Sequence, residues 1–390
     1  MNKPILLLLL FFCFTLSLTA AGPWRKRPLT FVAPDSVVTW DYSGSSFASR
    51  ALSRDSTLRT PRFVVTKQIE AKRENLAAVA RQIAANLNVV GGGENERTEP
   101  QGIPAMMNMS TNAYLFLLTG KAVHMDMVER SFYNALLQTS ECTSLPFRQP
   151  DRHGSFEALL AVGGLLYATE GEDLYVNLYT NATAHVTLGS TSFVVDQITD
   201  MPASGRVRLR FTKLHHPTRF RLHLRMPDWL VHRKPEGTLY AYTDTATALP
   251  HIFVSGFEAE GLTMDEDGYV VIDRTWQKLD EVYFDLPLTP QLLRRSNAEG
   301  TAMARGKVAF QCGPLVYAVE GQTDGFYFSA NDQPTQTGTI TEGGLPVMQV
   351  PLYDGASTPA DGAAQRRVFR ATPFCENTDS VGCVWLTECR

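Results

Sequence analysis

The chain lacks several features that would narrow its function at once. Its 390 residues contain no internal repeat, no low-complexity tract and no marked excess of one charge. The 36 basic and 40 acidic side chains give a formal net charge of −4. This balance gives no sign of the basic surface that proteins use to bind nucleic acids or anionic membranes. We therefore expect no nucleic-acid partner.

Cysteine is scarce, and the spacing of the six cysteines matches no zinc-binding pattern. Cys13 lies near the N-terminus, and the others are Cys142, Cys312, Cys375, Cys383 and Cys389. Removal of an N-terminal signal peptide that contains Cys13 leaves five cysteines, and an odd number in an exported protein leaves at least one thiol free or bonded to another molecule. The cysteines near the C-terminus leave room for one disulfide, because an exported protein meets oxidising conditions. The sequence does not fix their pairing.

A long apolar run lies at the start of the chain. Lys3 supplies a positive charge, residues 5–18 are almost wholly apolar, and the small residues 19–21 follow. The run is too short and wrongly flanked for a membrane span, so it predicts a signal peptide over residues 1–21, cleaved near residues 20–22. Cys13 lies within the run instead of at its end, which argues against a lipid anchor. We expect a secreted or periplasmic protein without a membrane span.

The next part of the chain is helical in pattern. After an irregular lead-in over residues 22–65, with one short strand at 29–32, apolar residues recur at helical spacing over 66–87. Further helices are predicted at 104–119, 123–137 and 155–168, with Pro104 in a first turn and Gly120 after a last turn. These four helices form a partial helical domain over residues 66–170.

From residue 171 the apolar period changes to two, which is typical of half-buried antiparallel strands. Leu222 and Leu224 alternate with Arg221, His223 and Arg225, so the leucines are expected to face inward. The pattern predicts a β-sandwich over 171–295. A second β-rich block, also expected to be a sandwich, covers 296–390, with strands near 307–310, 315–319, 347–352 and 367–371.

Seven segments in this order resemble glycoside hydrolase family 127. They are LFLLTGKAVHMDMVERSFYNALL (115–137), LLYATEGEDLYVNLY (165–179), QITDMP (197–202), LRMPDW (224–229), GYVVIDRTW (268–276), GKVAFQCGPLVYAVEG (306–321) and TPFCENTDSVGCVWL (372–386). In the first segment, the family's turn and its E-R-x-x-Y-N helix correspond to Asp126, Glu129, Arg130, Tyr133 and Asn134.

The resemblance implies a fold and a chemistry. The family has an (α/α)6 barrel followed by β-sandwich domains, so this chain is expected to be a multidomain α + β protein with a remnant of that barrel. Known members include β-L-arabinofuranosidases. They use a zinc-bound cysteine thiolate as nucleophile and a glutamate as general acid/base. A Glu-x-Cys pair and two adjacent cysteines hold the zinc.

Most of the residues that this chemistry needs are not found at the corresponding positions. The Glu-x-Cys place falls on Gln101, Gly102 and Ile103. Near the place of the adjacent cysteines stands Cys142 alone, or Pro150 and Asp151 when the count runs back from the fourth helix. One cysteine cannot build a thiolate-rich, four-ligand zinc site. We therefore expect no cofactor, although the resemblance itself implies zinc.

Some candidate site residues remain in the loops between the helices. Glu94 follows the family's Gly-Gly position and, with Cys142, is the candidate catalytic pair; Asp151 and His153 are candidate metal ligands beside that thiol. The weaker candidates for contact with substrate are Glu99, Gln101 and Arg148. The alternative interpretation is a solvated acidic loop and a structural cysteine. Trp24, Tyr240 and Tyr242 are aromatic residues of the kind that stack on sugars, but the sequence does not bring them together.

Two functional classes follow from these observations. The first is a secreted relative of family 127 that acts on or binds L-arabinofuranose-type or related glycans with an incomplete hydrolytic site. The second is a catalytically inactive carbohydrate-binding or structural β-sandwich protein, or a truncated gene product. Half a helical barrel leaves apolar faces partly uncovered, so we expect either that the strands cover them or that the protein self-associates.

Overall fold

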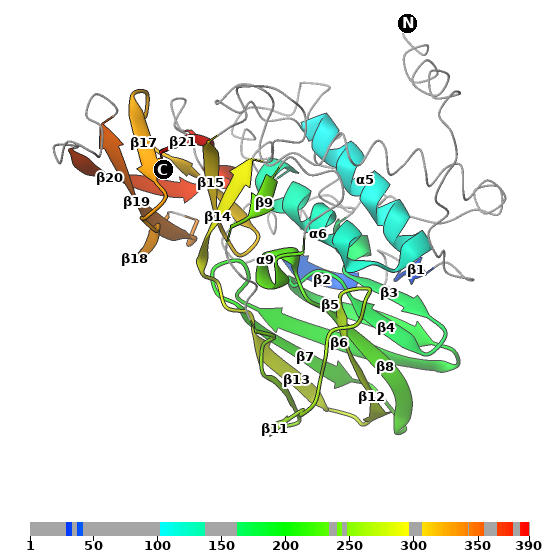
Figure 1. The fold of residues 1–390 in the computed structure, drawn as a ribbon. Coiled ribbons are helices and arrows are strands. Elements are labelled where there is room, and N and C mark those ends of the chain that lie inside the picture. Colours follow the sequence, from blue (N-terminus) through cyan, green and yellow to red (C-terminus); the bar gives the residue numbers. More distant parts are fainter. Residues whose placement is uncertain are drawn as a thin grey trace, which may run out of the picture.

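The computed structural model is rich in β-strands and has few helices (Figure 1). It describes residues 29–32, 37–41, 102–136, 162–233, 240–243, 248–295, 306–341, 343–354, 365–376 and 383–389. The helical elements are α5 (Gly102–Thr119), α6 (Ala122–Ser131), the π-helical η2 (Phe132–Leu136), α9 (Asp228–Val231) and the 3-10 turns η4 (Gly163–Leu165) and η7 (Phe374–Glu376). In this part of the chain, no helix is both long enough and apolar enough to cross a membrane.

Two sheets form the middle of the molecule. The five-stranded sheet has the order β1 (Thr30–Phe31), β3 (Tyr167–Glu170), β4 (Asp173–Val176), β8 (Thr218–Arg225) and β12 (Tyr269–Trp276). The seven-stranded sheet has the order β11 (Phe257–Glu258), β10 (Ile252–Val254), β13 (Glu281–Asp285), β7 (Arg206–Thr212), β6 (Thr191–Thr199), β5 (Asn181–Leu188) and β2 (Val37–Asp41). The strands pair antiparallel except β4 with β8.

Aromatic side chains join the facing sides of these two sheets. Phe211 of β7 lies 5.4 Å from Phe220 of β8 and 4.8 Å from Trp276 of β12, between ring centroids. Phe193 of β6 stacks on Phe220 at 5.2 Å. The alternating pattern of the sequence therefore places one apolar row of each strand in a shared core.

The other face of the five-stranded sheet is also covered. Phe116 of α5 contacts Tyr175 of β4 edge-on at 6.3 Å, and α5 and α6 lie over the strands (Figure 1). Consequently Leu174, Tyr175, Val176 and Asn177 are all buried, on both faces of the strand. Periodicity alone does not reveal this, because it reports one buried face.

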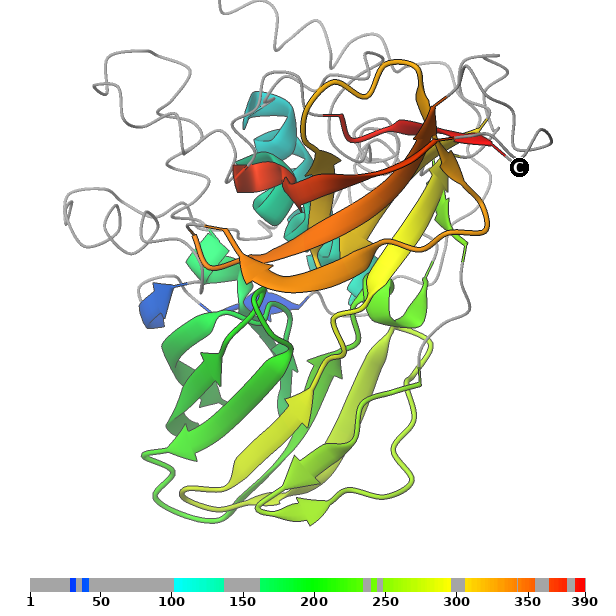
Figure 2. The same ribbon diagram turned by 90° about the vertical axis from the view of Figure 1, so that its left-hand side faces the viewer.

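The C-terminal strands form a third, nine-stranded sheet that closes on itself. Its order is β16 (Leu315–Val319), β20 (Arg366–Pro373), β19 (Pro346–Asp354), β17 (Phe326–Ser329), β21 (Leu386–Cys389), β15 (Lys307–Cys312), β14 (Pro290–Arg295) and β9 (Tyr240–Tyr242), with β18 (Thr335–Ile340) beside β19. Because β15 also pairs with β16, the strands from β16 to β15 make a barrel (Figure 2). This closed arrangement takes the place of the second sandwich expected for 296–390.

Several predicted elements differ from those in the structure. The helix predicted over 155–168 is wrong at its end, because η4 is a single turn and β3 begins at Tyr167. There, a run of apolar residues enters a buried strand, which the periodicity does not distinguish from a helix. The lead-in is not wholly irregular, since β1 and β2 add strands to both middle sheets. The four strands predicted after residue 300 are confirmed as β15, β16, β19 and β20.

Cys312, Cys375 and Cys383 are buried and Cys389 is partly so, and no disulfide joins any two of these four described cysteines. The pairing considered from the sequence is therefore not formed. Burial raises the pKa of the Cys312 thiol to about 12. A buried thiol of this kind is a weak nucleophile.

Candidate functional site

Polar side chains line the helix-facing side of β8 at alternate positions. The exposure of their side chains falls along the strand, from 71% at Arg219 and 55% at Arg221 to 10% at His223 and 0% at Arg225. The strand thus runs from solvent to a position beneath α6. A guanidinium placed there must find partners, since an unpaired buried charge is very costly.

Arg225 finds these partners on α6. Its Nη1 lies 2.5 Å from Asp126 Oδ1 and its Nη2 lies 2.5 Å from Glu129 Oε1. The spacing of three residues puts both carboxylates on the same face of the helix. Trp229 Nε1 donates to the other oxygen of Glu129 at 3.0 Å. Burial raises the pKa of Glu129, against the attraction of Arg225.

A second pair adjoins the first. Arg130 Nη2 lies 2.7 Å from Asp228 Oδ2 and donates to the hydroxyl of Tyr242 at 2.9 Å. Arg233 binds the second oxygen of Asp126 at 2.5 Å. Burial raises the pKa of Asp228 to about 6, and the positive charge of Arg130 opposes this rise.

We call these charged residues the junction network; they are Asp126, Glu129, Arg130, Arg225, Asp228 and Arg233. Its three carboxylates and three guanidinium groups balance, and each takes part in at least one ion pair. All are buried except the partly exposed Arg233. The arrangement holds the helices to the sheet and offers no open position for a substrate.

The same helical segment also contacts the C-terminal barrel. Asn134 of η2 donates from Nδ2 to the carbonyl of Pro314 at 2.8 Å, and its Oδ1 accepts from the backbone N–H of Val316 at 2.7 Å. The E-R-x-x-Y-N segment therefore joins the helices, the five-stranded sheet and the C-terminal barrel. These contacts give the segment a structural role.

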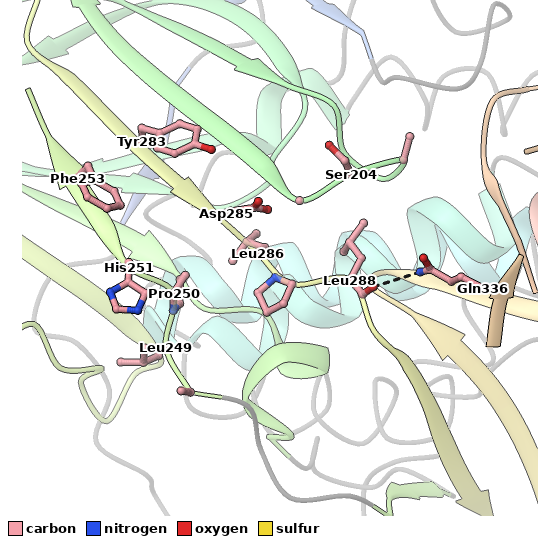
Figure 3. Close-up of a pocket in the computed structure, with 14 residues that line it drawn as sticks. Ser204, Leu249, Pro250, His251, Phe253, Tyr283, Asp285, Leu286, Leu288 and Gln336 are labelled. Carbon is pink, nitrogen blue, oxygen red and sulfur yellow. Dashed lines mark hydrogen bonds between the residues drawn. The ribbon is translucent and has the colours of Figure 1, made fainter. Parts of the chain in front are cut away.

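The described part of the chain also has an open pocket of about 660 Å³ (Figure 3). Its lining comes from residues 203–205, 248–251, 253, 283, 285–288 and 336. Most of it lies at one end of the seven-stranded sheet, and Gln336 of β18 adds a side chain from the C-terminal barrel. Gln336 Nε2 donates to the carbonyl of Leu288 at 3.2 Å. Pockets of this size with a mixed apolar and polar lining are typical of ligand sites.

The catalytic and ligand residues expected from the sequence are not tested by the structure. They all lie outside the described residues, and they are Glu94, Glu99, Gln101, Cys142, Arg148, Asp151 and His153. Within the described residues, no three His, Cys, Asp or Glu side chains gather in a way that could hold a metal ion. The role of each of these residues stays a prediction.

Of the aromatic residues considered as sugar platforms, only Tyr242 has a described side chain. It stacks on His232 at 4.6 Å and accepts from Arg130, so it belongs to the surroundings of the junction network. Sequence reasoning missed the aromatic pair of the pocket, Phe253 and Tyr283. Alternation in HIFV and EVYFD places both on outward faces, but it cannot show that the two strands are neighbours.

Comparisons with known proteins agree with this fold. Residues 173–288 match the model of the beta-L-arabinofuranosidase GH127 middle domain. This segment contains β4 to β13, with the whole of β8 and β12. A search among curated proteins found no match to the chain.

Similar solved structures include a GH127 beta-arabinofuranosidase, with 22% identity, a TM-score of 0.64, 79% of this chain covered and 54% of the other. A GH127 beta-L-arabinofuranosidase from Geobacillus stearothermophilus T6 has 18% identity, a TM-score of 0.59 and coverage of 78% and 54%. A third, described as a glycoside hydrolase, has 20% identity, a TM-score of 0.57 and coverage of 76% and 54%. The chain thus spans about half the length of the structures it matches. With the fold shared over most of the chain and the middle domain matched in sequence, the protein is GH127-like.

Proposed function

We propose that the protein is an exported, GH127-like protein that binds L-arabinofuranose-type or related glycans and has an incomplete hydrolytic site. The observation that carries the proposal is the match of residues 173–288 to the GH127 middle domain. That match sits within a fold similar to GH127 structures over 79% of the chain. The two solved relatives named as arabinofuranosidases supply the sugar class by analogy.

The finer description of the fold is part of this proposal. We assign α5 and α6 to the end of an (α/α)6 barrel and the two facing sheets to the β-sandwich that follows it. The support is the helix-to-sheet order along the chain and the aromatic contacts between the sheets. The helices cover one face of the five-stranded sheet, as the contact of Phe116 with Tyr175 indicates.

The donor set of this chain does not fit the family's zinc. A thiolate-rich site needs several cysteine ligands. The bound metal keeps the thiols of these cysteines deprotonated. Gln101 and Ile103 stand where the Glu and the Cys of the Glu-x-Cys pair are expected, and α5 begins between them at Gly102. An amide is a poor substitute for a carboxylate ligand, and an isoleucine side chain cannot bind a metal. These residues therefore support no catalytic step through zinc, and of the residues expected for the chemistry only the counterparts Glu94 and Cys142 remain.

The alternative function is a structural protein, or a truncated gene product, that binds no glycan. The junction network favours this alternative in one respect. The described residues that match the family's E-R-x-x-Y-N helix serve to hold the fold together. They would persist in a protein selected for its scaffold alone.

Binding, hydrolysis and metal content separate the two functions. A glycan array that includes L-arabinofuranosides, probed with the purified chain, is expected to show binding. An aryl β-L-arabinofuranoside is expected to remain uncleaved, and the purified protein is expected to hold no stoichiometric zinc. Hydrolysis that is lost in Glu94→Gln, or zinc that is lost in Cys142→Ser, would show a complete site. An array without any bound glycan would favour the structural alternative.

A further inference from the structure

The pocket of Figure 3 has an aromatic wall on the outer face of the seven-stranded sheet. Phe253 of β10 and Tyr283 of β13 are directly opposite each other in the antiparallel register. Their ring centroids lie 6.4 Å apart at an interplanar angle of 42°. Tyr283 is 38% exposed, although it lies in the middle of a strand. Two adjacent rings that face solvent offer an apolar surface on which the C–H face of a sugar ring can pack.

Polar groups surround this wall. The carboxylate of Asp285 projects into the pocket between the aromatic pair and Ser204, whose hydroxyl lies on the facing loop (Figure 3). His251 lines the lower side, and Gln336 the far end. These groups donate and accept hydrogen bonds in the way that sugar hydroxyls require. A mixed set of this kind, beside an apolar wall, orients a ligand and makes its recognition specific.

The charges around the pocket are largely compensated. Arg206, opposite Asp285 in the strand register, pairs with Asp200 at 2.5 Å. His251 hydrogen-bonds Glu258 on the neighbouring strand. Among the lining residues, Asp285 is the only carboxylate, and the lining has no lysine or arginine. An anionic ligand would be repelled by Asp285, so the electrostatics favour a neutral ligand over an anionic one.

The pocket is also rigid at its base. A Cβ atom on Gly205 would lie 1.7 Å from the carbonyl oxygen of Leu286, so only glycine allows the two segments to approach so closely. The N–H of Leu286 donates to the carbonyl of Gly205 at 2.9 Å. Pro250 and Pro287 line the same pocket and restrict the backbone on two further sides. A pre-formed site loses little entropy when it binds a ligand.

We propose that this pocket is a glycan-binding subsite for a short, neutral oligosaccharide, with Tyr283 and Phe253 as its stacking platform. The proposal rests on the proposed function for its ligand class and adds to it the place where the glycan binds. None of the residues that line the pocket is one of the predicted catalytic residues. Binding here therefore needs no hydrolytic chemistry.

The test compares two aromatic substitutions on β13 and β11, two strands of the same sheet. Tyr283→Ala removes half of the platform, whereas Phe257→Ala removes an aromatic side chain that is 80% exposed on β11 and does not line the pocket. Titration of an arabinofuranosyl trisaccharide, followed by calorimetry, is expected to show affinity about tenfold weaker for Tyr283→Ala, as befits the loss of an aromatic anchor. Phe257→Ala is expected to bind like the unaltered protein.

Two further measurements complete the experiment. Asp285→Asn keeps the shape of an exposed side chain. It is expected to lower the affinity for the same trisaccharide about threefold, because it replaces a charged hydrogen-bond acceptor by a neutral one. Thermal unfolding of each variant shows whether its fold is intact.

The outcomes separate this inference from the proposed function. If the unaltered protein binds the trisaccharide and neither Tyr283→Ala nor Asp285→Asn weakens it, the pocket is not the subsite, while the glycan-binding function stands. If the unaltered protein binds neither the trisaccharide nor any glycan of the array, both are overturned. Tighter binding of a trisaccharide that carries a carboxylate would overturn the neutral-ligand assignment.

Discussion

The two ends of β8 carry the same kind of side chain in opposite surroundings. At the solvent end, Arg219 forms a two-pronged ion pair with Asp273 of β12, at 3.0 Å for both bonds. At the covered end, Arg225 pairs with Asp126 and Glu129 of α6, fully out of contact with solvent. Arg219 and Arg225 lie on the same face of the strand, because an even number of residues separates their positions. Only the helix that lies over one end makes them different.

The comparison shows where charge contributes to this fold. An exposed pair gains little, because water solvates both partners and salt screens them. A buried ion pair stabilises the fold little more than an apolar pair of the same shape would. The loss of one partner, however, leaves the other charge buried and unpaired, which is strongly destabilising. The junction network is therefore a point of mutual dependence between helices and sheet. The pocket, by contrast, keeps its polar groups accessible to a ligand.

The largest effect is expected from Arg225→Ala. It leaves Asp126 with Arg233 and the backbone N–H of Asp228, and Glu129 with Trp229, as described partners for the two neighbouring carboxylates. The expected cost is about 3–5 kcal/mol of unfolding free energy, typical of a broken buried ion pair. Denaturant unfolding followed by tryptophan fluorescence measures it. A midpoint close to that of the unaltered protein would show that the covered end of β8 behaves like the exposed end.

The dependence of stability on pH sharpens the comparison through Asp228. Its pKa is raised to about 6 by burial, above the ordinary aspartate value of 3.8. Between about pH 4 and pH 6 the folded state therefore holds a proton that the unfolded state has lost, and stability falls as the pH rises through that window. A difference of about two units between the folded and unfolded pKa corresponds to roughly 3 kcal/mol of unfolding free energy. Burial also raises the pKa of Glu129, which acts in the same direction, so Asp228→Asn is expected to reduce this fall without abolishing it, as measured by unfolding at several pH values.

Asp173 provides the control, because its pKa is shifted in the opposite direction. Burial raises it, but the hydrogen bonds from His223 and Arg221 outweigh burial and lower the pKa of Asp173 below the usual value. The stability that Asp173 contributes is therefore present above about pH 4 and lost as the pH falls further. Asp173→Asn is expected to leave the slope between pH 4 and pH 6 unchanged. A slope lost in Asp173→Asn and kept in Asp228→Asn would contradict both assignments.

A smaller effect separates the junction from the core between the sheets. Trp229 donates to the carboxylate of Glu129 at 3.0 Å, whereas Trp276 donates to the backbone carbonyl of Phe220 at 3.0 Å. Both rings are fully buried. Replacement of either tryptophan by phenylalanine removes similar volume, so the difference between the two variants reports the hydrogen bond. Trp229→Phe is expected to cost about 1 kcal/mol more, because hydrogen bonds to charged groups are stronger. Equal losses in denaturant unfolding would show that the charge of Glu129 adds nothing.

Much of the β-rich fold could be predicted from the sequence. Alternation of apolar and polar residues found β8 and β12, and apolar runs separated by Gly- and Pro-rich segments found four C-terminal strands. It could not show that Arg225 is buried, since nothing within β8 reveals that α6 lies over its end. It also could not show that β15 pairs with β16 and so closes a barrel. Both features depend on contacts between segments distant in the sequence.

The site was less accessible to sequence reasoning. The residues expected to be catalytic, such as Glu94 and Cys142, were chosen by their place in a family pattern, and the structure does not describe them. The pocket was missed because Tyr283 and Phe253 are ordinary outward residues of two strands and become a pair only through the register between them. Gln336 reaches the pocket from another sheet. Motif spacing carries no information about either relation.

The smallest effect is expected at the solvent end of β8. Arg219→Ala removes a guanidinium that is paired in ideal geometry but largely exposed, and Asp273 is left in water instead of in the interior. Solvation of the remaining carboxylate offsets the lost attraction, and the side chain regains its freedom. The unfolding midpoint is expected to match that of the unaltered protein within experimental error, at low and at high salt. Arg219→Ala and Arg225→Ala therefore make a matched pair on one strand. If Arg219→Ala destabilised the protein as much as Arg225→Ala does, the position of α6 would not be the source of the difference, and the account of the junction network would fail.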